Sequence, residues 1–471
     1  MHLIAIGGSD AGISAALRAR ELDPDAEVTV VVADAYPNFS ICGIPYLISG
    51  EVGHWRDLAH RSVADLEATG MRLRLDTRAT AIDPTDHQVH LHGSDGRQET
   101  VGYDALVVGT GALPVVPPIA GLAGPEALGA ADGVHLLHSM GDTFALATTL
   151  ERQPARALIV GAGYVGLEMA EGLTVRGVRV TQVERLPEVL PTVDAELGAL
   201  VRAELSDHGV EVVTATTVRS VDRAPAGAAG HLRVEASGPD GQRTTWDVDL
   251  VLVSVGVRPE TGLLVVAGAA TGPAGAVVVD ETMRTGLPDV FAAGDCVVTH
   301  HQLLGPTYLP LGTTAHKQGR VAGENAVGGV ARYAGSLGTQ VVKAFDLVAG
   351  RTGLRDHEAA GAFRPATTAS APDDHKAYYP GAHPIATRLT GDLDTGRLLG
   401  AQLVGRLGTE IAKRVDVYAA AIHHHMSVAG IDDLDLSYTP PLGSPWDAVQ
   451  IAAQAWVRDH QQRTREDLTP A

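Results

Sequence analysis

The stretch ALIVGAGYVGLEMAEGLTVRGVRVTQVE, residues 157–184, decides the fold class of this chain. An apolar strand enters a turn that holds Gly161, Gly163 and Gly166, a helix follows, and a second apolar strand ends at Glu184. This is the full G-x-G-x-x-G pattern of a βαβ unit that binds a dinucleotide at the helix N-terminus. A carboxylate such as Glu184 accepts the ribose hydroxyls of NADH and repels a 2′-phosphate, which favours NADH over NADPH, although the adjacent Arg185 could accommodate a phosphate.

The N-terminal residues repeat this arrangement in a less regular form. Residues 3–22, LIAIGGSDAGISAALRAREL, predict a strand, a glycine turn and a helix, and residues 26–32, AEVTVVV, predict the next strand. Gly7, Gly8 and Gly12 supply the turn, while Ser9 stands where the motif has its middle glycine. Asp34 is the candidate acid for a ribose. Two such units predict an α/β fold with two Rossmann-like dinucleotide-binding domains.

The composition of the 471 residues fits this fold and argues against other classes. Apolar residues make up 45%, and 54 Gly with 26 Pro indicate a globular chain with many tight turns. The 36 Lys and Arg against 56 Asp and Glu give a net charge of −20, which argues against a nucleic-acid partner. No apolar run is long enough to span a membrane, and a strand begins at Leu3, so we expect a cytoplasmic protein without membrane contact.

Three more apolar strands end in polar turns and predict further cofactor contacts. Two of them lie in residues 103–114 and 249–259, and the third, residues 289–296, leads to an acid; a helix opens shortly after residue 310. An acid at such a turn can bond a ribityl hydroxyl, and a helix start can stabilise negative charge on a reduced isoalloxazine. The candidate residues are Thr110, Gly111, Gly256, Asp295, Gly312 and Thr313.

The segment Asn38-Phe-Ser-Ile-Cys-Gly-Ile-Pro-Tyr46 places Cys42 where a helix is expected to begin. A thiol at a helix N-terminus has a lowered pKa, so its nucleophilic thiolate is more populated. The alternative is that Cys42 is a small buried apolar residue, as a lone cysteine usually is. The second cysteine, Cys296, follows Asp295 in an apolar turn and is expected to pack in the core.

These motifs together resemble the flavoprotein disulfide reductases, and the Ser-x-Cys-Gly-x-Pro-Tyr segment resembles their single-cysteine branch. That branch contains coenzyme A disulfide reductases, NADH oxidases and NADH peroxidases, and the resemblance runs from Leu3 to about Ile451. It implies FAD in the first nucleotide fold, with Ser40 beside it, NAD(P)H in the second, and Cys42 against the flavin. A glutathione reductase is excluded because its second cysteine is absent: Tyr46 and Leu47 stand at the fourth and fifth positions after Cys42.

The resemblance also implies a domain order and an assembly. It predicts a discontinuous FAD domain (1–120 and 249–333), an NAD(P) domain (121–248), a C-terminal α+β dimerisation domain (334–460) and a polar tail (461–471). In a homodimer with a shared active site, Tyr379 (or its neighbour Tyr378) and Tyr438 would reach the cysteine of the partner and protonate a leaving thiolate. The alternative for each tyrosine is ordinary interface packing.

Two positions depart from the family pattern. Asp10 stands where oxidases and peroxidases have a histidine, and a carboxylate there would oppose thiolate formation or relay a proton. Coenzyme A-binding members carry paired arginines on the first helix, whereas this chain has Arg18 and then Arg20-Glu21, which puts coenzyme A binding in question. No metal site is predicted, because consecutive residues such as His423, His424 and His425 point around a helix instead of converging.

The sequence therefore favours an FAD-dependent NAD(P)H oxidoreductase that reduces the disulfide or persulfide of a small thiol through Cys42. One alternative is an NADH oxidase that reduces O2 through a sulfenic acid on Cys42. Another is a flavoprotein that responds to NADH and turns over little. The electron acceptor and the choice between NADH and NADPH stay open at this stage.

Overall fold

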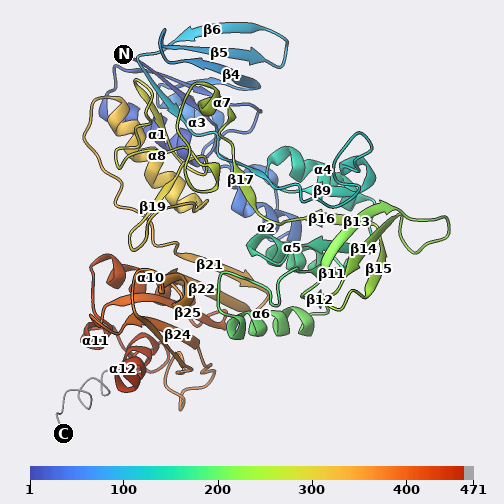
Figure 1. The fold of residues 1–471 in the computed structure, drawn as a ribbon, viewed down its shortest axis with the longest axis vertical. Coiled ribbons are helices and arrows are strands. Elements are labelled where there is room, and N and C mark those ends of the chain that lie inside the picture. The colour runs from blue at the N-terminus through green and yellow to red at the C-terminus, as the bar shows by residue number, and fades with distance from the viewer. Residues whose placement is uncertain (461–471) are drawn as a thin grey trace. The chain divides into compact units, whose positions relative to one another are not determined.

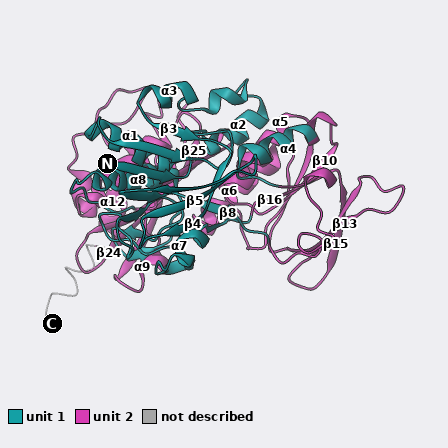
Figure 2. Cartoon of the chain, turned by 90° about the horizontal axis from the view of Figure 1, so that it is seen from above, with its two compact units in different colours: residues 1–116, 136–148, 255–336 teal, residues 117–135, 149–254, 337–471 magenta. Residues whose placement is uncertain are grey.

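A computed structural model describes residues 1–460 of the chain (Figure 1). The chain divides into two compact units, which are coloured separately in Figure 2. Unit 1 contains residues 1–116, 136–148 and 255–336, and unit 2 contains residues 117–135, 149–254 and the part from 337 on. None of the described helices is both long and apolar enough to cross a membrane.

Unit 1 is built on a parallel five-stranded sheet in the order β18-β7-β1-β2-β3. Its central strands are apolar on both faces because helices cover them, as expected for a parallel sheet. The helices α1 (Asp10–Leu22) and α8 (Gly312–Ala326) pack against each other. The strands are β1 (His2–Ile6), β2 (Glu27–Val31), β3 (Arg72–Arg74), β7 (Ala105–Val108) and β18 (Val290–Ala292).

Smaller elements complete unit 1. An antiparallel sheet contains β4 (Thr77–Asp83), β5 (Gln88–Gly93) and β6 (Gln98–Gly102). Two strand pairs are β8 (Ala112–Pro114) with β17 (Val257–Pro259), and β19 (Thr299–His301) with β20 (Gly305–Thr307). The short helices are α2 (Ile44–Ser49), α3 (Val63–Ala68), α7 (Gly262–Val266) and the 3₁₀ turns η1 (Ile41–Gly43), η2 (Trp55–Leu58) and η4 (Pro273–Gly275).

Unit 2 begins with a second sheet, ordered β12-β11-β10-β16-β9, in which β10 pairs in parallel with β11 and β16. A three-stranded antiparallel sheet, β13-β14-β15, follows. The strands are β9 (Val134–Leu136), β10 (Arg156–Val160), β11 (Arg179–Val183), β12 (Glu211–Val213), β13 (Thr217–Arg223), β14 (Leu232–Ser237), β15 (Arg243–Val248) and β16 (Leu250–Val253). The helices are η3 (Ala130–Asp132), α5 (Tyr164–Val175) and α6 (Ala195–Asp207). Helix α4 (Met140–Glu151) belongs to unit 1 up to Thr148, and only its last turn belongs to unit 2.

The C-terminal part of unit 2 is an antiparallel sheet, β21-β22-β25-β24-β23, with helices that bury Tyr418 and Trp456. Its strands are β21 (Gln340–Ala344), β22 (Leu347–Gly353), β23 (Pro365–Ser370), β24 (Ala386–Asp392) and β25 (Leu398–Arg406). Its helices are α9 (Asp356–Ala359), α10 (Ile411–His423), α11 (Val428–Asp432) and α12 (Ala448–His460). The predicted fold class, two Rossmann-like sheets followed by an α+β domain, is confirmed.

The two compact units depart from the expected domain boundaries most clearly at two places. Strand β16 pairs with β10 and so completes the second sheet, although the expected boundary assigned residues from 249 on to the first domain. Residues 136–148 cluster with unit 1, although they were expected in the second domain. The first difference has no sequence signal, because the apolar run of β16 fits either sheet equally well. The predicted polar tail, 461–471, lies outside the described residues.

Candidate active site

The first glycine loop is too tightly packed to admit side chains. A Cβ on Gly12 would lie 2.1 Å from the carbonyl oxygen of Gly7, and a Cβ on Gly7, whose φ is +121°, would lie 2.1 Å from the carbonyl oxygen of Gly109. A Cβ on Gly8 would meet Val32 Cγ1 at 2.4 Å. Ser9, the N-cap of α1, makes no side-chain cap bond, so that the first amides of α1 keep their capacity to bind an anion. The loop therefore fits a pyrophosphate.

Two buried polar atoms, one beside this loop and one close to Asp295, have no protein partner among the described residues. They are Oδ1 of Asn38 and the hydroxyl of Tyr308. Asn38 adopts a φ of +60°, and its backbone N–H donates to the carbonyl of Gly8 at 2.6 Å, so its side chain is held beside the glycine loop. Buried polar atoms are nearly always hydrogen-bonded in proteins. Both atoms therefore fit a site that a polar cofactor completes.

Asp295 is the most perturbed carboxyl of unit 1. Burial, followed by the negative charge of Asp10, raises its pKa to about 6. Burial also raises the pKa of Asp10, against the opposing charges of His316 and His60. Gly312, the first residue of α8, is close to Asp10, since a Cβ there would lie 3.1 Å from Asp10 Oδ2. The predicted positions Asp295, Gly312 and Thr313 thus belong to one region of unit 1, where a ligand hydroxyl could satisfy the carboxyl of Asp295.

Cys42 lies in η1, immediately before α2, so the predicted helix start at this residue is confirmed. The thiol is exposed, which rules out the alternative of a small buried residue. Leu58 fixes the turn: Ser40 N–H donates to the carbonyl of Leu58 at 2.8 Å, and a Cβ on Gly43 would lie 2.5 Å from Leu58 Cδ2. The second cysteine differs in every respect. Cys296 is fully buried, its Sγ donates to the carbonyl of Ala293 at 3.4 Å, and burial raises its pKa.

In the second glycine loop, Gly161 has a φ of +104° and Gly163 is the N-cap of α5. A Cβ on Gly166 would lie 2.4 Å from the Gly161 carbonyl oxygen. Glu184 is buried, and its two carboxylate oxygens accept the N–H groups of Ala162 and Leu186, each at 2.8 Å. Each oxygen retains lone-pair capacity for a ribose hydroxyl. Glu184 therefore also shapes the loop, a role that the sequence pattern did not predict.

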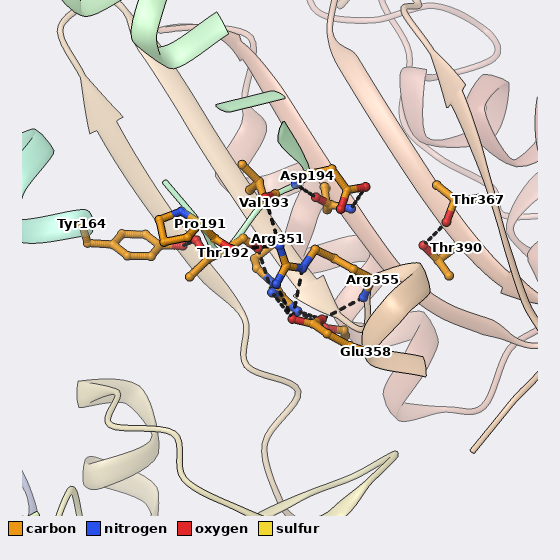
Figure 3. A network of polar contacts seen from close by, with 12 residues as sticks. Tyr164, Pro191, Thr192, Val193, Asp194, Arg351, Arg355, Glu358, Thr367 and Thr390 are labelled. Atoms are coloured by element: carbon orange, nitrogen blue, oxygen red, sulfur yellow. Dashed lines mark hydrogen bonds and ion pairs between the residues drawn. The ribbon is translucent and has the colours of Figure 1, made fainter. Parts of the chain in front are cut away.

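Figure 3 shows how the loop after Glu184 is held by the C-terminal part of unit 2. Arg351 donates to the carbonyl of Thr192 at 2.7 Å, and Arg355 donates to the carbonyls of Pro191 and Val193. Glu358 pairs with both arginines. Although burial opposes ionisation, the hydrogen bonds from Arg351 and Arg355 outweigh it and lower the pKa of Glu358 to about 2.

This loop also reaches the glycine motif. Thr192 Oγ1 is 3.3 Å from the hydroxyl of Tyr164, the first residue of α5 (Figure 3). We call Arg351, Arg355 and Glu358 the arginine clamp. It binds backbone carbonyls of the loop that borders the second nucleotide motif. Because every residue type has a backbone carbonyl, the sequence of the loop does not reveal this contact.

Three other predicted positions have mainly structural contacts. The hydroxyl of Thr110 donates to the carbonyl of Glu260 at 2.6 Å, and Gly111, with a φ of +72°, accepts the N–H of Glu260. Gly256, with a φ of +103°, accepts the N–H of Val115. These bonds hold the β8–β17 crossover together. Asp34 is exposed in the turn after β2 and accepts the N–H of Tyr36 at 2.9 Å.

The predicted tyrosines lie in unit 2 on an exposed surface. Tyr378, rather than Tyr379, bonds to the hydroxyl of Tyr438, and this hydrogen bond raises the pKa of Tyr378. Tyr379 instead packs edge-on against the ring of His375, with the ring centroids 5.7 Å apart. The two segments meet because Lys376 N–H donates to the carbonyl of Pro440.

Sequence reasoning missed Asn38, Tyr308 and the partners of Asp10. Asn38 had one local signal, since asparagine is among the few residues that adopt a positive φ readily. Tyr308 and His316 had none, because their neighbours come from distant parts of the chain.

Comparison with known proteins agrees with this geometry. A family model for the pyridine nucleotide-disulphide oxidoreductases matches residues 1–319. A protein named NADH oxidase from Methanocaldococcus jannaschii is 32% identical over 96% of this chain and 98% of its own length. The reduced CoADR-RHD protein of Bacillus anthracis aligns with a TM-score of 0.91 and 30% identity, covering 98% of this chain and 81% of its own. A NAD-dependent persulfide reductase from A. fulgidus aligns with a TM-score of 0.90 and 34% identity, covering 98% and 84%.

The family match covers more than half of the chain, and the relatives are similar over nearly all of it. The observed glycine loops and the exposed cysteine lie within the matched residues. The chain therefore belongs to the pyridine nucleotide-disulphide oxidoreductases, a family of oxidoreductases that depend on FAD and NAD(P)H.

Proposed function

We propose that this oxidoreductase uses NAD(P)H and FAD to reduce the disulfide or persulfide of a small thiol at Cys42. The contrast between the two cysteines carries the proposal. Cys42 is exposed, whereas Cys296 is fully buried and donates to backbone carbonyls. An internal disulfide between them is therefore not available for turnover. The sulfur that is reduced must be bonded to Cys42 from outside the chain.

The residues of each site have separate tasks in this proposal. The loop with Gly7, Gly8 and Gly12 would hold the pyrophosphate of FAD, and Asp295 would bond its ribityl chain. The loop with Gly161, Gly163 and Gly166 would hold the nicotinamide nucleotide. When bound, FAD accepts hydride from the nicotinamide and supplies an electron pair to sulfur.

Cys42 then acts as the nucleophile. Its thiolate attacks one sulfur of the substrate disulfide, which forms a mixed disulfide and releases the other sulfur as a thiolate. Reduction of the mixed disulfide by two electrons releases the second substrate thiolate and restores the Cys42 thiolate. A tyrosine hydroxyl from the Tyr378–Tyr438 pair would donate the proton that a departing thiolate takes.

We also propose a homodimer with a shared active site. Five large side chains of the segments 376–379 and 438–446 are exposed in unit 2, and we call them the aromatic patch; the two segments meet through Lys376 with Pro440 and Tyr378 with Tyr438. The patch consists of Tyr378, Tyr379, Tyr438, Leu442 and Trp446. Exposed apolar groups that gather in one place mark an interaction surface. A second copy of the chain is the partner that would bring these tyrosines to a Cys42.

The arginines of α1 bear on the choice of thiol. Arg18 pairs with Glu21 at 2.8 Å and with Glu324 at 2.6 Å. Arg20 donates to the carbonyls of Thr69, Pro24 and Ala26. Both guanidinium groups are thus engaged within unit 1 instead of being presented to a polyphosphate. This arrangement favours a thiol without the phosphate groups of coenzyme A, although one of the similar structures is a CoADR protein.

Mass spectrometry tests the proposal. After incubation with a disulfide and without reductant, the FAD-loaded enzyme should carry one thiol adduct, on Cys42. Cys42→Ser should abolish both the adduct and NADH-dependent disulfide reduction, and the matched control Cys296→Ser should keep both. An enzyme that reduces disulfides at an undiminished rate with Ser at position 42 would refute the role of the thiol.

NADH oxidase activity is the second candidate, and the similarity to the Methanocaldococcus jannaschii protein of that name favours it. In that case O2 would take two electrons from the reduced flavin, and the hydrogen peroxide formed would oxidise the Cys42 thiolate to a sulfenic acid with release of water. Two further electrons from NADH would return the sulfenic acid to the thiolate and release a second water. Oxygen uptake with NADH alone separates the two. Rapid uptake that Cys42→Ser abolishes would support the oxidase, and slow uptake beside rapid disulfide reduction would support the reductase.

A further inference from the structure

Three side chains from distant segments of unit 1 converge on one point. Asp10 begins α1, His60 follows η2, and His316 lies in the first turns of α8. His316 Nε2 lies 3.3 Å from Asp10 Oδ1, and one ligand atom from each of the three residues lies within 4.8 Å of the other two. We propose that Asp10, His60 and His316 bind a divalent transition-metal ion of the zinc type.

The chemistry of the three groups selects this class of ion. Two imidazoles and one carboxylate are the ligands that Zn²⁺ and its neighbours in the first transition series prefer. Ca²⁺ and Mg²⁺ prefer sites made of oxygen atoms alone. Three protein ligands leave at least one coordination position for water, which suits a site that solvent can reach.

A fourth residue orients the site. Ser14 lies one turn after Asp10 on α1, and its hydroxyl is 3.0 Å from Nδ1 of His316. This hydrogen bond occupies the ring nitrogen that faces away from Asp10, so that Nε2 is the nitrogen directed to the ion. Metal-binding histidines are commonly oriented in this way by a hydrogen bond at their other nitrogen.

The ligands are also accessible. His60 is exposed, and the side chains of His316 and Asp10 retain 46% and 23% of their accessible surface. An ion could therefore enter from solvent without rearrangement of the fold.

An ion at this site would connect the first glycine loop with the Cys42 segment. His60 N–H donates to the carbonyl of Asn38 at 2.9 Å, and Asn38 N–H donates to the carbonyl of Gly8. The two segments are also joined one step further on: Ser40, two residues after Asn38, donates its N–H to the carbonyl of Leu58, two residues before His60. The proposal stands on unit 1 alone and does not depend on the electron acceptor.

The test uses Zn²⁺ alone as the probe on the purified FAD-loaded enzyme, with binding measured by equilibrium dialysis and elemental analysis. We expect one Zn²⁺ per chain. His60→Ala and His316→Ala should each weaken binding by about 100-fold or more, and Ser14→Ala by about tenfold. Flavin content verifies that each variant is folded, and the exposed position of His60 makes that variant the decisive one.

Controls address the other residues that could hold zinc. Glu204, His208 and Asp346 form a second cluster, but Glu204 already pairs with Arg406 at 2.8 Å. His208→Ala, a His423→Ala/His424→Ala double variant and Cys42→Ser should therefore retain the ion. The proposal fails if the wild-type enzyme binds no Zn²⁺, or if His60→Ala and His316→Ala bind it as tightly as the wild type. It also fails if one of the controls abolishes binding instead.

Discussion

At the scale of one residue, the buried carboxyl of Asp295 lowers the stability of the folded protein. Burial and the neighbouring charge of Asp10 raise its pKa from 3.8 to about 6. The folded protein therefore binds more protons than the unfolded chain between these values, and its stability falls as the pH rises through that window. Above pH 6 the ionised carboxyl costs roughly 3 kcal/mol, because each unit of pKa shift corresponds to about 1.4 kcal/mol.

We therefore predict opposite effects of Asp295→Asn on stability and on cofactor retention. In flavin-free protein at pH 7.5, the variant should be more stable than the wild type by as much as about 3 kcal/mol, since the buried charge is gone. The same variant should lose FAD more readily, because the proposed acceptor for a ribityl hydroxyl is weakened. Denaturant unfolding and flavin release measure the two effects. Asp289→Asn, at a half-exposed carboxyl, is the control and should change neither; a destabilised flavin-free Asp295→Asn protein would contradict the prediction.

The pKa of Glu358 is shifted in the opposite direction from that of Asp295, so its effect on stability has the opposite pH dependence. Hydrogen bonds from Arg351 and Arg355 outweigh burial and lower its pKa from 4.5 to about 2. The folded protein binds fewer protons than the unfolded chain in this window, so the stability that Glu358 contributes is complete above pH 4.5 and is lost as the pH falls toward 2. The shift corresponds to roughly 3 kcal/mol.

Glu358→Gln should thus destabilise unit 2 by about 3 kcal/mol at pH 7 and flatten the loss of stability between pH 4.5 and 2. Because the arginine clamp holds the loop beside Tyr164, the variant should also raise the KM for NADH more than it lowers kcat. Acid unfolding and steady-state kinetics measure these effects. Glu196→Gln, at an exposed carboxylate that lies 3.6 Å from Arg388, is the control. Equal pH profiles for the wild type and Glu358→Gln would show that the clamp does not depend on the charge.

At the scale of elements, the contact between α1 and α8 depends on two glycines. A Cβ on Gly319 would lie 2.3 Å from the carbonyl oxygen of Ala11, and a Cβ on Gly323 would lie 2.1 Å from that of Ala15. Both obstacles are backbone atoms, so no side chain can move aside. Helices α1 and α8, which carry two of the three proposed metal ligands, Asp10 and His316, therefore approach each other as closely as their backbones allow.

Gly323→Ala should force the two helices apart and destabilise unit 1 by about 1–3 kcal/mol, as overpacking of a core usually does. Denaturant unfolding, monitored by the flavin fluorescence that appears when the cofactor is released, measures this effect. Gly141→Ala is the matched control within a helix, because its Cβ would meet only the hydroxyl of Ser139, at 3.6 Å. The control should be neutral or slightly stabilising, since alanine favours helix over glycine by about 1 kcal/mol. An unchanged midpoint for Gly323→Ala would mean that α8 shifts at little cost.

Local patterns were sufficient to predict the elements but not their neighbours. Gly161, Gly163 and Gly166 predicted a strand, turn and helix because backbone geometry at those positions requires glycine. The strand at residues 250–253 was recognised, but its sheet was not, because an apolar run fits any parallel sheet. Gly319 and Gly323 give no such signal, since a glycine inside a helical pattern can have several causes.

At the scale of the whole molecule, the site residues fall into two groups: those in contiguous motifs, which the sequence predicted, and those that only the fold brings together. Cys42 could be singled out from the sequence because its motif is contiguous, and the structure places it exposed in η1. The residues around Asp10 were not, because their contacts join positions far apart in the chain; Ser14 and His316 are separated by 302 positions. Among the predicted tyrosines, the sequence does not show which of Tyr378 and Tyr379 contacts Tyr438. The partner of Tyr438 is Tyr378, and only the fold of residues 376–379 against Pro440 decides this.

The proposed dimer makes a prediction that no single chain can satisfy. If Cys42 of one protomer works with Tyr378 and Tyr438 of the other, then Cys42→Ser homodimers and Tyr378→Phe/Tyr438→Phe homodimers should both be impaired in disulfide reduction. A mixed dimer carries both defects at one site and none at the other. With random mixing, half of the dimers are mixed and each has one intact site of two, so about a quarter of the wild-type activity should return.

Coexpression of the two variants with different affinity tags, followed by tandem purification, isolates the mixed dimer for this assay. The purified mixed dimer should show about half of the wild-type rate per dimer, since one of its two sites is intact. A mixed dimer of Cys42→Ser with differently tagged Cys42→Ser is the control and should stay inactive. If the purified mixed dimer is no more active than the average of its parents, the cysteine and the tyrosines do not work across the interface. If no mixed dimer forms at all, the aromatic patch is not a contact between copies of this chain.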